Sequence, residues 1–106
     1  MNKVLTLLGF ASKAGKLSYG FDAVRTSLSQ KKSKLLLLAN DISQKSKKEI
    51  LFFGNKYNVS VIDLEQIDIQ TLSHAVGRKC GIISVNDESF TSGLLAAIYA
   101  GRNLND

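Results

Sequence analysis

Apolar positions recur along this chain with two periods, which predict two kinds of element. Apolar side chains spaced three or four residues apart are typical of amphipathic helices, and they occur near residues 4–11, 23–28, 50–53, 69–76 and 94–99. Shorter segments typical of strands lie between them, at residues 17–19, 34–39, 59–62 and 82–85. The segment 34–39 holds four consecutive leucines, which indicates a strand buried on both faces.

Residues with known capping preferences mark the predicted helix ends. Gly20, Ser43, Asp68 and Ser89 stand where helices are expected to begin, and Gly77 where one is expected to end. The periodicity places Ala23 on one helix face with Val24 and Leu28, and it points Leu51 inward with Ile50 and Phe53. Tyr99 is among the apolar positions that define the last helix.

The alternation of helices and strands predicts the fold class. It favours an α/β sandwich in which helices cover both faces of a central mixed sheet of about four strands. Residues 1–106 are expected to form a single domain, because a chain of this length buries enough surface for one core. Residues 103–106 are expected to be loose.

The composition excludes several classes of protein. The one cysteine, Cys80, has no partner for an internal disulfide, and Cys80 with His74 is too few ligands for a zinc site. The apolar stretch 4–11 is much shorter than a membrane span and lacks the flanks of a signal peptide. We therefore expect a cytoplasmic protein with no metal, no cofactor and no membrane association.

The charge is unevenly distributed. Residues 1–56 carry eleven lysines and arginines but three acidic residues, whereas residues 57–106 carry three basic and six acidic residues. A basic half beside an acidic half suggests a polyanionic partner, and nucleic acid is the first candidate because Lys and Arg neutralise phosphates. A lysine-rich solvated surface is the alternative explanation.

Motifs for catalysis are absent from the sequence. Gly9, Gly15 and Lys16 differ from a phosphate-binding loop in their spacing, and Leu17 stands where that motif needs Ser or Thr. Cys80 with His74 as its base would be a nucleophile only with a geometry that sequence does not reveal. We therefore assign no catalytic residue.

Three segments have the character of binding loops. A basic loop leads into a predicted helix start, where free backbone N–H groups bind phosphates. A polar pair follows the leucine strand, and a basic turn lies between two glycines that permit close approach to a ligand. The candidate binding residues of these segments are Lys13, Lys16, Gly20, Phe21, Asp22, Arg25, Asn40, Asp41, Gly77, Arg78, Lys79 and Cys80.

These segments together resemble the ribosomal protein L7Ae family of kink-turn RNA-binding proteins. The resemblance covers about residues 3–100 and rests on Gly20-Phe21-Asp22, Leu35-Leu36-Leu37-Leu38-Ala39-Asn40-Asp41 and Leu72-Ser73-His74-Ala75-Val76-Gly77. The small bacterial members, the YlxQ-type proteins, are nearest in size. The resemblance implies a three-layer α/β/α sandwich that binds sharply bent RNA containing tandem sheared G·A pairs, with ribosomal RNA an expected partner.

The resemblance also implies where RNA is read, and this chain departs from the family there. Family members read the guanines with a Gly-x-Asn-Glu loop and a later Lys, and Asp22, Ala23 and Thr26 replace that Asn, Glu and Lys. An ionised carboxylate only accepts hydrogen bonds, as do guanine O6 and N7, so Asp22 cannot copy the Asn contact. Arg25 is the candidate for the missing donor. The family's second loop corresponds to residues 77–81, and Ser73 replaces its usual preceding glycine.

Two functional hypotheses follow. The first is a non-enzymatic, monomeric, ribosome-associated protein that binds kink-turn or similarly bent RNA on one cationic rim containing Lys16, Arg25 and Arg78. The alternative is a protein-interaction or regulatory member of the same fold that has lost specific recognition. A small enzyme using Cys80 is a third, weaker hypothesis.

Overall fold

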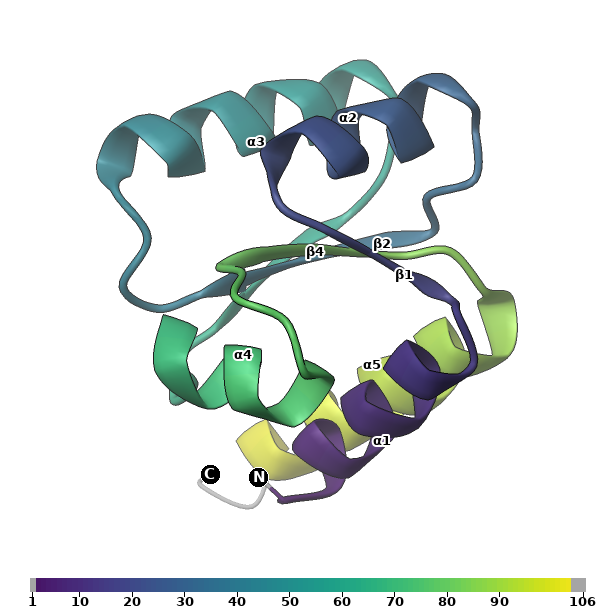
Figure 1. Cartoon of the computed structure of the whole chain (residues 1–106), viewed down its shortest axis with the longest axis vertical. Coiled ribbons are helices and arrows are strands. Elements are labelled where there is room, and N and C mark those ends of the chain that lie inside the picture. Colours follow the sequence, from purple (N-terminus) through teal and green to yellow (C-terminus); the bar gives the residue numbers. More distant parts are fainter. Residues whose placement is uncertain (1, 104–106) are drawn as a thin grey trace.

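A computed structural model describes residues 2–103 and shows a sheet between two layers of helices (Figure 1). In chain order the elements are α1 (Asn2–Lys13), β1 (Leu17–Tyr19), α2 (Phe21–Ser29), β2 (Leu35–Ala39), α3 (Gln44–Lys56), β3 (Val61–Leu64), α4 (Ile69–Val76), β4 (Ile82–Val85) and α5 (Glu88–Asn103). Residues 103–106 were expected to be loose, but Asn103 is the last residue of α5. The rest of that segment lies outside the described residues.

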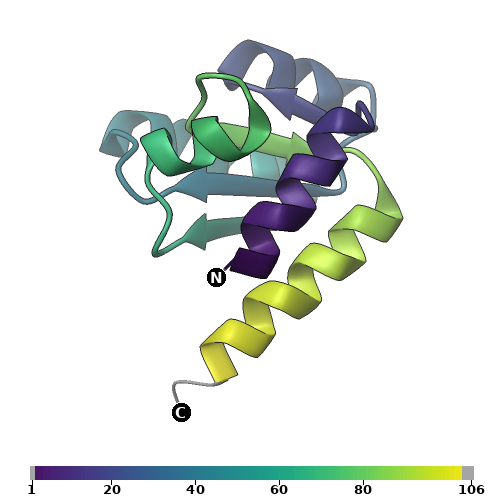
Figure 2. The ribbon, with the colours of Figure 1, turned by 60° about the horizontal axis from the view of Figure 1, so that its bottom comes forward.

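The strand order is β1-β4-β2-β3, and the sheet is mixed. β4 runs antiparallel to both β1 and β2, whereas β3 pairs with β2 in parallel. Helices α2 and α3 cover one face, and α1, α4 and α5 cover the other (Figure 1). Figure 2 shows α1 beside α5 on the second face. The predicted α/β/α sandwich with a four-stranded mixed sheet is confirmed.

The leucine strand β2 divides its side chains between two cores. Leu35 and Leu37 enter the core beneath α1, α4 and α5, and Leu36 and Leu38 enter the core beneath α2 and α3. All four are fully buried. Successive side chains of a strand point to opposite faces, so a strand covered on both faces needs an unbroken apolar run.

The predicted caps Ser43, Asp68 and Gly77 stand at helix ends. The Ser43 and Asp68 side chains accept hydrogen bonds from the backbone N–H groups of Ser46 and Thr71. That bond from Thr71 holds the pKa of Asp68 below its ordinary value. Gly77 ends α4 in the left-handed conformation.

Three predicted boundaries differ from the structure. β2 begins at Leu35 rather than at residue 34. β3 spans Val61–Leu64 rather than 59–62, because the Val59 N–H bonds to the Gly54 carbonyl and closes the turn after α3. α5 begins at Glu88 rather than at Ser89, because the Asp87 carboxylate accepts the Phe90 N–H at 2.8 Å and caps the helix.

Three apolar side chains of the predicted helices are exposed, including Leu51, which was expected to point inward. Leu51 is 45% exposed and Tyr99 is 51% exposed, and Ala23 also faces outward. The buried stripe of α3 runs instead through Ile50 and Gly54, four residues apart. Leu51, one position on, is rotated off that stripe, since neighbouring residues of a helix point about 100° apart.

Gly9, considered above for a phosphate-binding loop, lies inside α1, where a Cβ atom would sit 3.3 Å from the Ala75 carbonyl of α4. Its role is close helix packing. Within residues 2–103, no helix combines the length and the apolar character that a membrane crossing requires.

Candidate nucleic-acid interface

Three loops far apart in the sequence meet at one end of the sheet. Because β1 and β2 run antiparallel to β4, their carboxyl ends lie beside the amino end of β4. The loops surround a shallow cleft of about 270 Å³, which we call the loop cleft. Its lining comprises Gly20, Phe21, Asp41, Ile42, Ser43, Ser46, Ile69, Gly81 and Ile82. Parts of all three predicted binding segments therefore converge.

Gly20 sets the path of the first loop. Its φ of +83° and ψ of +166° lie in a region that is nearly exclusive to glycine. Its N–H donates to the Ile82 carbonyl at 2.9 Å, and its own carbonyl accepts the Val24 N–H at 3.0 Å. Gly20 thus ties the start of α2 to the start of β4, which brings Phe21 to the loop cleft.

The second loop is held by its polar pair. The Asn40 side-chain amide donates to the Glu65 carbonyl at 2.9 Å, and the Asp41 carboxylate accepts the Ile69 N–H at 2.8 Å. Both residues thereby join the end of β2 to the segment before α4. Asn40 and Asp41 were predicted as ligand contacts, and the structure gives them this structural role.

Ser73 holds the third loop. Its hydroxyl accepts the Cys80 N–H at 2.9 Å and contacts the Cys80 carbonyl at 3.1 Å. The sequence showed Ser73 only as a departure from the family pattern, and its hydrogen-bonding role depends on the turn at Gly77. Arg78 and Lys79 are left exposed at the tip of this loop.

Cys80 itself is 6% exposed. Burial raises the pKa of its thiol, more than the nearby Arg78 charge lowers it, so the thiol is protonated at neutral pH. A protonated, buried thiol is a poor nucleophile, and His74 is exposed on α4. The structure does not support Cys80 as a nucleophile or as a side chain that touches a ligand.

The two arginines lie on opposite layers of the sandwich. The Arg78 guanidinium lies 5.0 Å from the centre of the Tyr19 ring, and that ring packs on the core beneath α1, α4 and α5. The Arg25 guanidinium lies 5.0 Å from the centre of the Phe53 ring and 5.7 Å from that of Phe21, between α2 and α3. Neither arginine lines the loop cleft itself: Arg25 lies by the ring of Phe21, which lines the cleft, and Arg78 lies in the loop that leads to Gly81.

Lys16 lies elsewhere. It precedes β1, whereas Gly20 follows β1, so the strand separates the two. Lys13, at the end of α1, is near Lys16 in the chain and exposed. The expectation of one cationic rim containing Lys16, Arg25 and Arg78 is therefore wrong. Strand direction brings the three loops together. The position of each basic side chain depends instead on which end of a strand, or which face of a helix, carries that residue.

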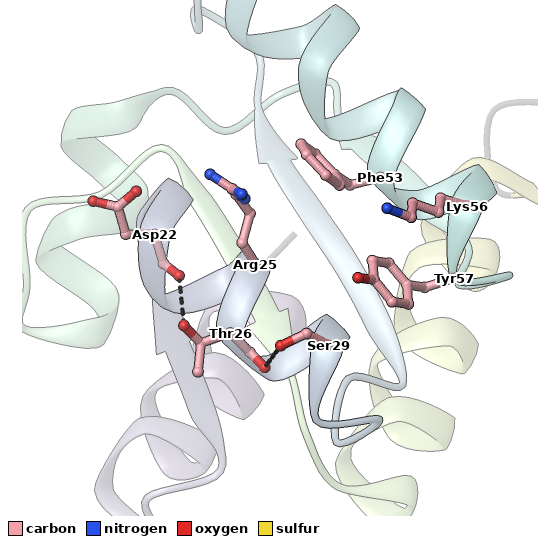
Figure 3. A pocket seen from close by; sticks show the side chains of 7 residues that line it. All are labelled: Asp22, Arg25, Thr26, Ser29, Phe53, Lys56 and Tyr57. Carbon is pink, nitrogen blue, oxygen red and sulfur yellow. Dashed lines mark hydrogen bonds between the residues drawn. The ribbon is translucent and has the colours of Figure 1, made fainter.

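Figure 3 shows the groove that holds Arg25, with a volume of about 320 Å³. Arg25 extends from α2 toward Phe53 on α3, and Lys56 and Tyr57 continue the α3 wall. The Thr26 hydroxyl donates to the Asp22 carbonyl at 3.1 Å, within its own helix. Thr26 therefore offers no cation at the position where the family carries its Lys.

Fold and loops together define a small α/β/α domain whose candidate surface is built at one end of a mixed sheet. The chain belongs to the Ribosomal protein L7Ae/L30e/S12e/Gadd45 family, whose sequence model matches residues 2–92.

Two curated relatives are both called RNA-binding protein YlxQ. The one from Bacillus subtilis (strain 168) is 28% identical over 93 residues, which cover 87% of this chain and 91% of the relative. The one from Enterococcus faecium is 26% identical over 88 residues, which cover 83% of this chain and 84% of the relative. These matches confirm the resemblance to YlxQ-type members of the family.

A solved structure has the same fold. It is described as the structure of a protein with unknown function from Bacillus halodurans C. The TM-score is 0.84 at 29% identity, and the match covers 91% of this chain and 96% of that chain.

Proposed function

We propose that this chain binds RNA, and that a bent, kink-turn-like RNA is its preferred ligand. One observation carries the proposal: the loops that correspond to the family's RNA-reading segments gather around a single cleft. Family membership and the names of the two YlxQ relatives support it. We further propose that the RNA belongs to the ribosome and that the protein acts in the cytoplasm.

The loop cleft suits a base better than a phosphate. Phe21, Ile42 and Ile82 give it apolar walls, and none of the described lining residues is basic. Apolar and aromatic walls receive the face of an unstacked base. Kinked RNA offers unstacked bases, whereas a regular A-form helix keeps its bases stacked and its major groove too narrow to enter.

The two nearby arginines supply the positive charge that the described lining of the cleft lacks. Arg25 lies by Phe21 of the cleft wall and Arg78 lies in the loop that leads to Gly81, and each guanidinium is backed by an aromatic ring. A guanidinium donates in a planar fork that fits guanine O6 and N7 or a phosphate. The two arginines can therefore grip RNA on both sides of a bend, in place of the donors missing at Asp22 and Thr26.

A titration tests this function. A kink-turn RNA and a straight duplex of equal length are each titrated with the protein at two salt concentrations. We expect tighter binding of the kink-turn RNA at both concentrations, because base contacts are less sensitive to salt than phosphate contacts. Equal affinities that weaken together with added salt would reduce the interaction to charge attraction and contradict the proposal.

A protein partner is the second candidate. It is motivated by Phe52 and Leu51 on α3, which are 63% and 45% exposed, and by the replaced family residues Asp22, Ala23 and Thr26. Under this hypothesis the titration detects no binding of either RNA, and Phe52→Ser releases a partner that the unsubstituted protein retains. RNA binding unaffected by Phe52→Ser favours the first function.

A further inference from the structure

A second groove lies at the opposite end of the sheet from the loop cleft. It has a volume of about 850 Å³ and is bordered by four lysines: Lys16, Lys31, Lys32 and Lys34. We call it the lysine groove. None of the described residues that line it is acidic or aromatic. Several ammonium groups around one hollow suit a ligand with several negative charges.

The base of the lysine groove is a hydrogen-bonded polar network. The Asn86 amide donates to the Ser18 hydroxyl at 2.9 Å, and its oxygen lies 2.6 Å from the buried Ser84 hydroxyl. Ser84 also contacts Ser33 at 2.7 Å. The network joins the ends of β1 and β4 to the turn before β2, and a satisfied network of this kind is rigid. The lysines therefore project from a fixed base.

The backbone at Lys31 supports a role for its charge. Lys31 has a φ of +60°, in the left-handed region that favours glycine after a helix. The Lys31 N–H bonds to the Leu28 carbonyl, and the Lys32 N–H bonds to the Ser27 carbonyl, which completes the helix-ending turn. A glycine would hold this turn with less strain, and what lysine adds is a cation.

Attraction to the helix end does not account for the whole cluster. Cations near a helix carboxyl terminus are favourable, which covers Lys31 and Lys32. Lys16 and Lys34 instead precede strands β1 and β2, and they line the same groove. The dipole of α2 therefore does not account for the position of Lys16 and Lys34.

We propose that the lysine groove binds the phosphate backbone of a stem that continues from the RNA held at the loop cleft. The inference rests on the proposed function and extends it to a second contact. Helix α2 links the two sites, with Phe21 at the loop cleft and Gln30 at the lysine groove. Its nine residues span about 13 Å, a distance that a few nucleotides cover. Lysines act as point charges toward phosphate, and none of the described residues that line the groove carries a ring on which a base could stack.

A pair of double variants tests the inference. Lys31→Gly with Lys34→Gln removes two charges from the lysine groove, and Lys45→Gln with Lys48→Gln removes two exposed charges from α3 as the matched control. Each protein is titrated with a kink-turn RNA that carries either a short or a long flanking stem, over a series of salt concentrations. Thermal melting of each protein checks the fold, and the glycine should keep or raise the melting temperature.

We expect the groove variant to bind the long-stem RNA several-fold more weakly. Its slope of log affinity against log salt should be less steep by about 1.5, since each lost phosphate contact contributes about 0.7–0.9. On the short-stem RNA its slope should equal that of the unsubstituted protein. The control variant should keep both slopes.

Equal slopes for the groove and control variants on the long-stem RNA would overturn the inference and leave the proposed function intact. Equal binding of a kink-turn RNA and a straight duplex by the unsubstituted protein would instead contradict the proposed function. The difference in salt slope between the groove and control variants would still show whether the groove lysines contact phosphate. Absence of any RNA binding by the unsubstituted protein would overturn both.

Discussion

Gly20 holds a conformation that residues with a Cβ atom rarely adopt, and among the described residues only Gly20 itself and its two chain neighbours could have heavy atoms within 4 Å of where that Cβ would be. Any cost of substitution therefore comes from the backbone. We expect Gly20→Ala to lower the free energy of unfolding by about 1–3 kcal/mol. Gly93→Ala, inside α5 with only an ordinary contact to Leu7 at 3.7 Å, should raise it by about 0.5–1 kcal/mol. Urea titrations measure the free energy of unfolding of both variants. If the two substitutions changed it in the same direction, the distinction between the two glycines would be refuted.

Cys80 makes a prediction about pH. Burial raises the pKa of its thiol, so the folded protein holds the proton at pH values where the unfolded chain releases it. The stability from this group is complete below the pKa of an unfolded thiol and is lost as pH rises through the raised folded pKa. We expect the free energy of unfolding to fall over that range. The fall should be smaller in Cys80→Ala, and identical pH profiles would contradict the assignment.

At the scale of elements, the Ser73 hydroxyl connects α4 to the loop that precedes β4. Ser73→Ala removes both hydrogen bonds to the Cys80 backbone, which leaves partly buried polar groups unsatisfied. We expect a loss of about 1–3 kcal/mol in the free energy of unfolding and faster hydrogen exchange at the Cys80 amide. Ser92→Ala, exposed on α5, is the matched control. Unchanged exchange at Cys80 would show that the turn at Gly77 holds the loop by itself.

The elements themselves were largely predictable from local signals. The leucine run of β2 and the caps at Ser43, Asp68 and Gly77 act within a few residues, so their effect is visible in the sequence. The start of β3 was not predictable in this way. The Val59 N–H bonds back to the Gly54 carbonyl, so the strand begins only at Val61. An apolar residue alone does not reveal whether its N–H joins a turn or a ladder.

At the scale of the whole molecule, Arg25 and Arg78 lie on opposite layers of the sandwich, each next to a loop that borders the loop cleft. We predict that Arg78→Gln weakens binding of a kink-turn RNA by about 1–3 kcal/mol and that of a straight duplex by less. Arg78→Lys keeps the charge and loses the planar fork, so it should retain the salt dependence but lose part of the preference for bent RNA. Gel-shift titrations measure both.

Equal losses on bent and straight RNA for Arg78→Gln would assign Arg78 a phosphate contact and no reading role. Lys48→Gln provides the control for removal of one surface charge. Because Arg78 lies over the Tyr19 ring, a melting curve of each variant separates a loss of packing from a loss of contact.

The sequence by itself determined the order of helices and strands, the two-sided burial of β2 and the family, because periodicity, caps and short motifs act over neighbouring residues. Only the tertiary structure decided which candidate residues share a surface. It assigned Asp41 to the start of α4, Arg25 to Phe53 on α3, and Lys16 to the lysine groove rather than the loop cleft. These neighbours come from distant segments, and their contacts depend on strand direction and on the helix face that packing turns toward solvent.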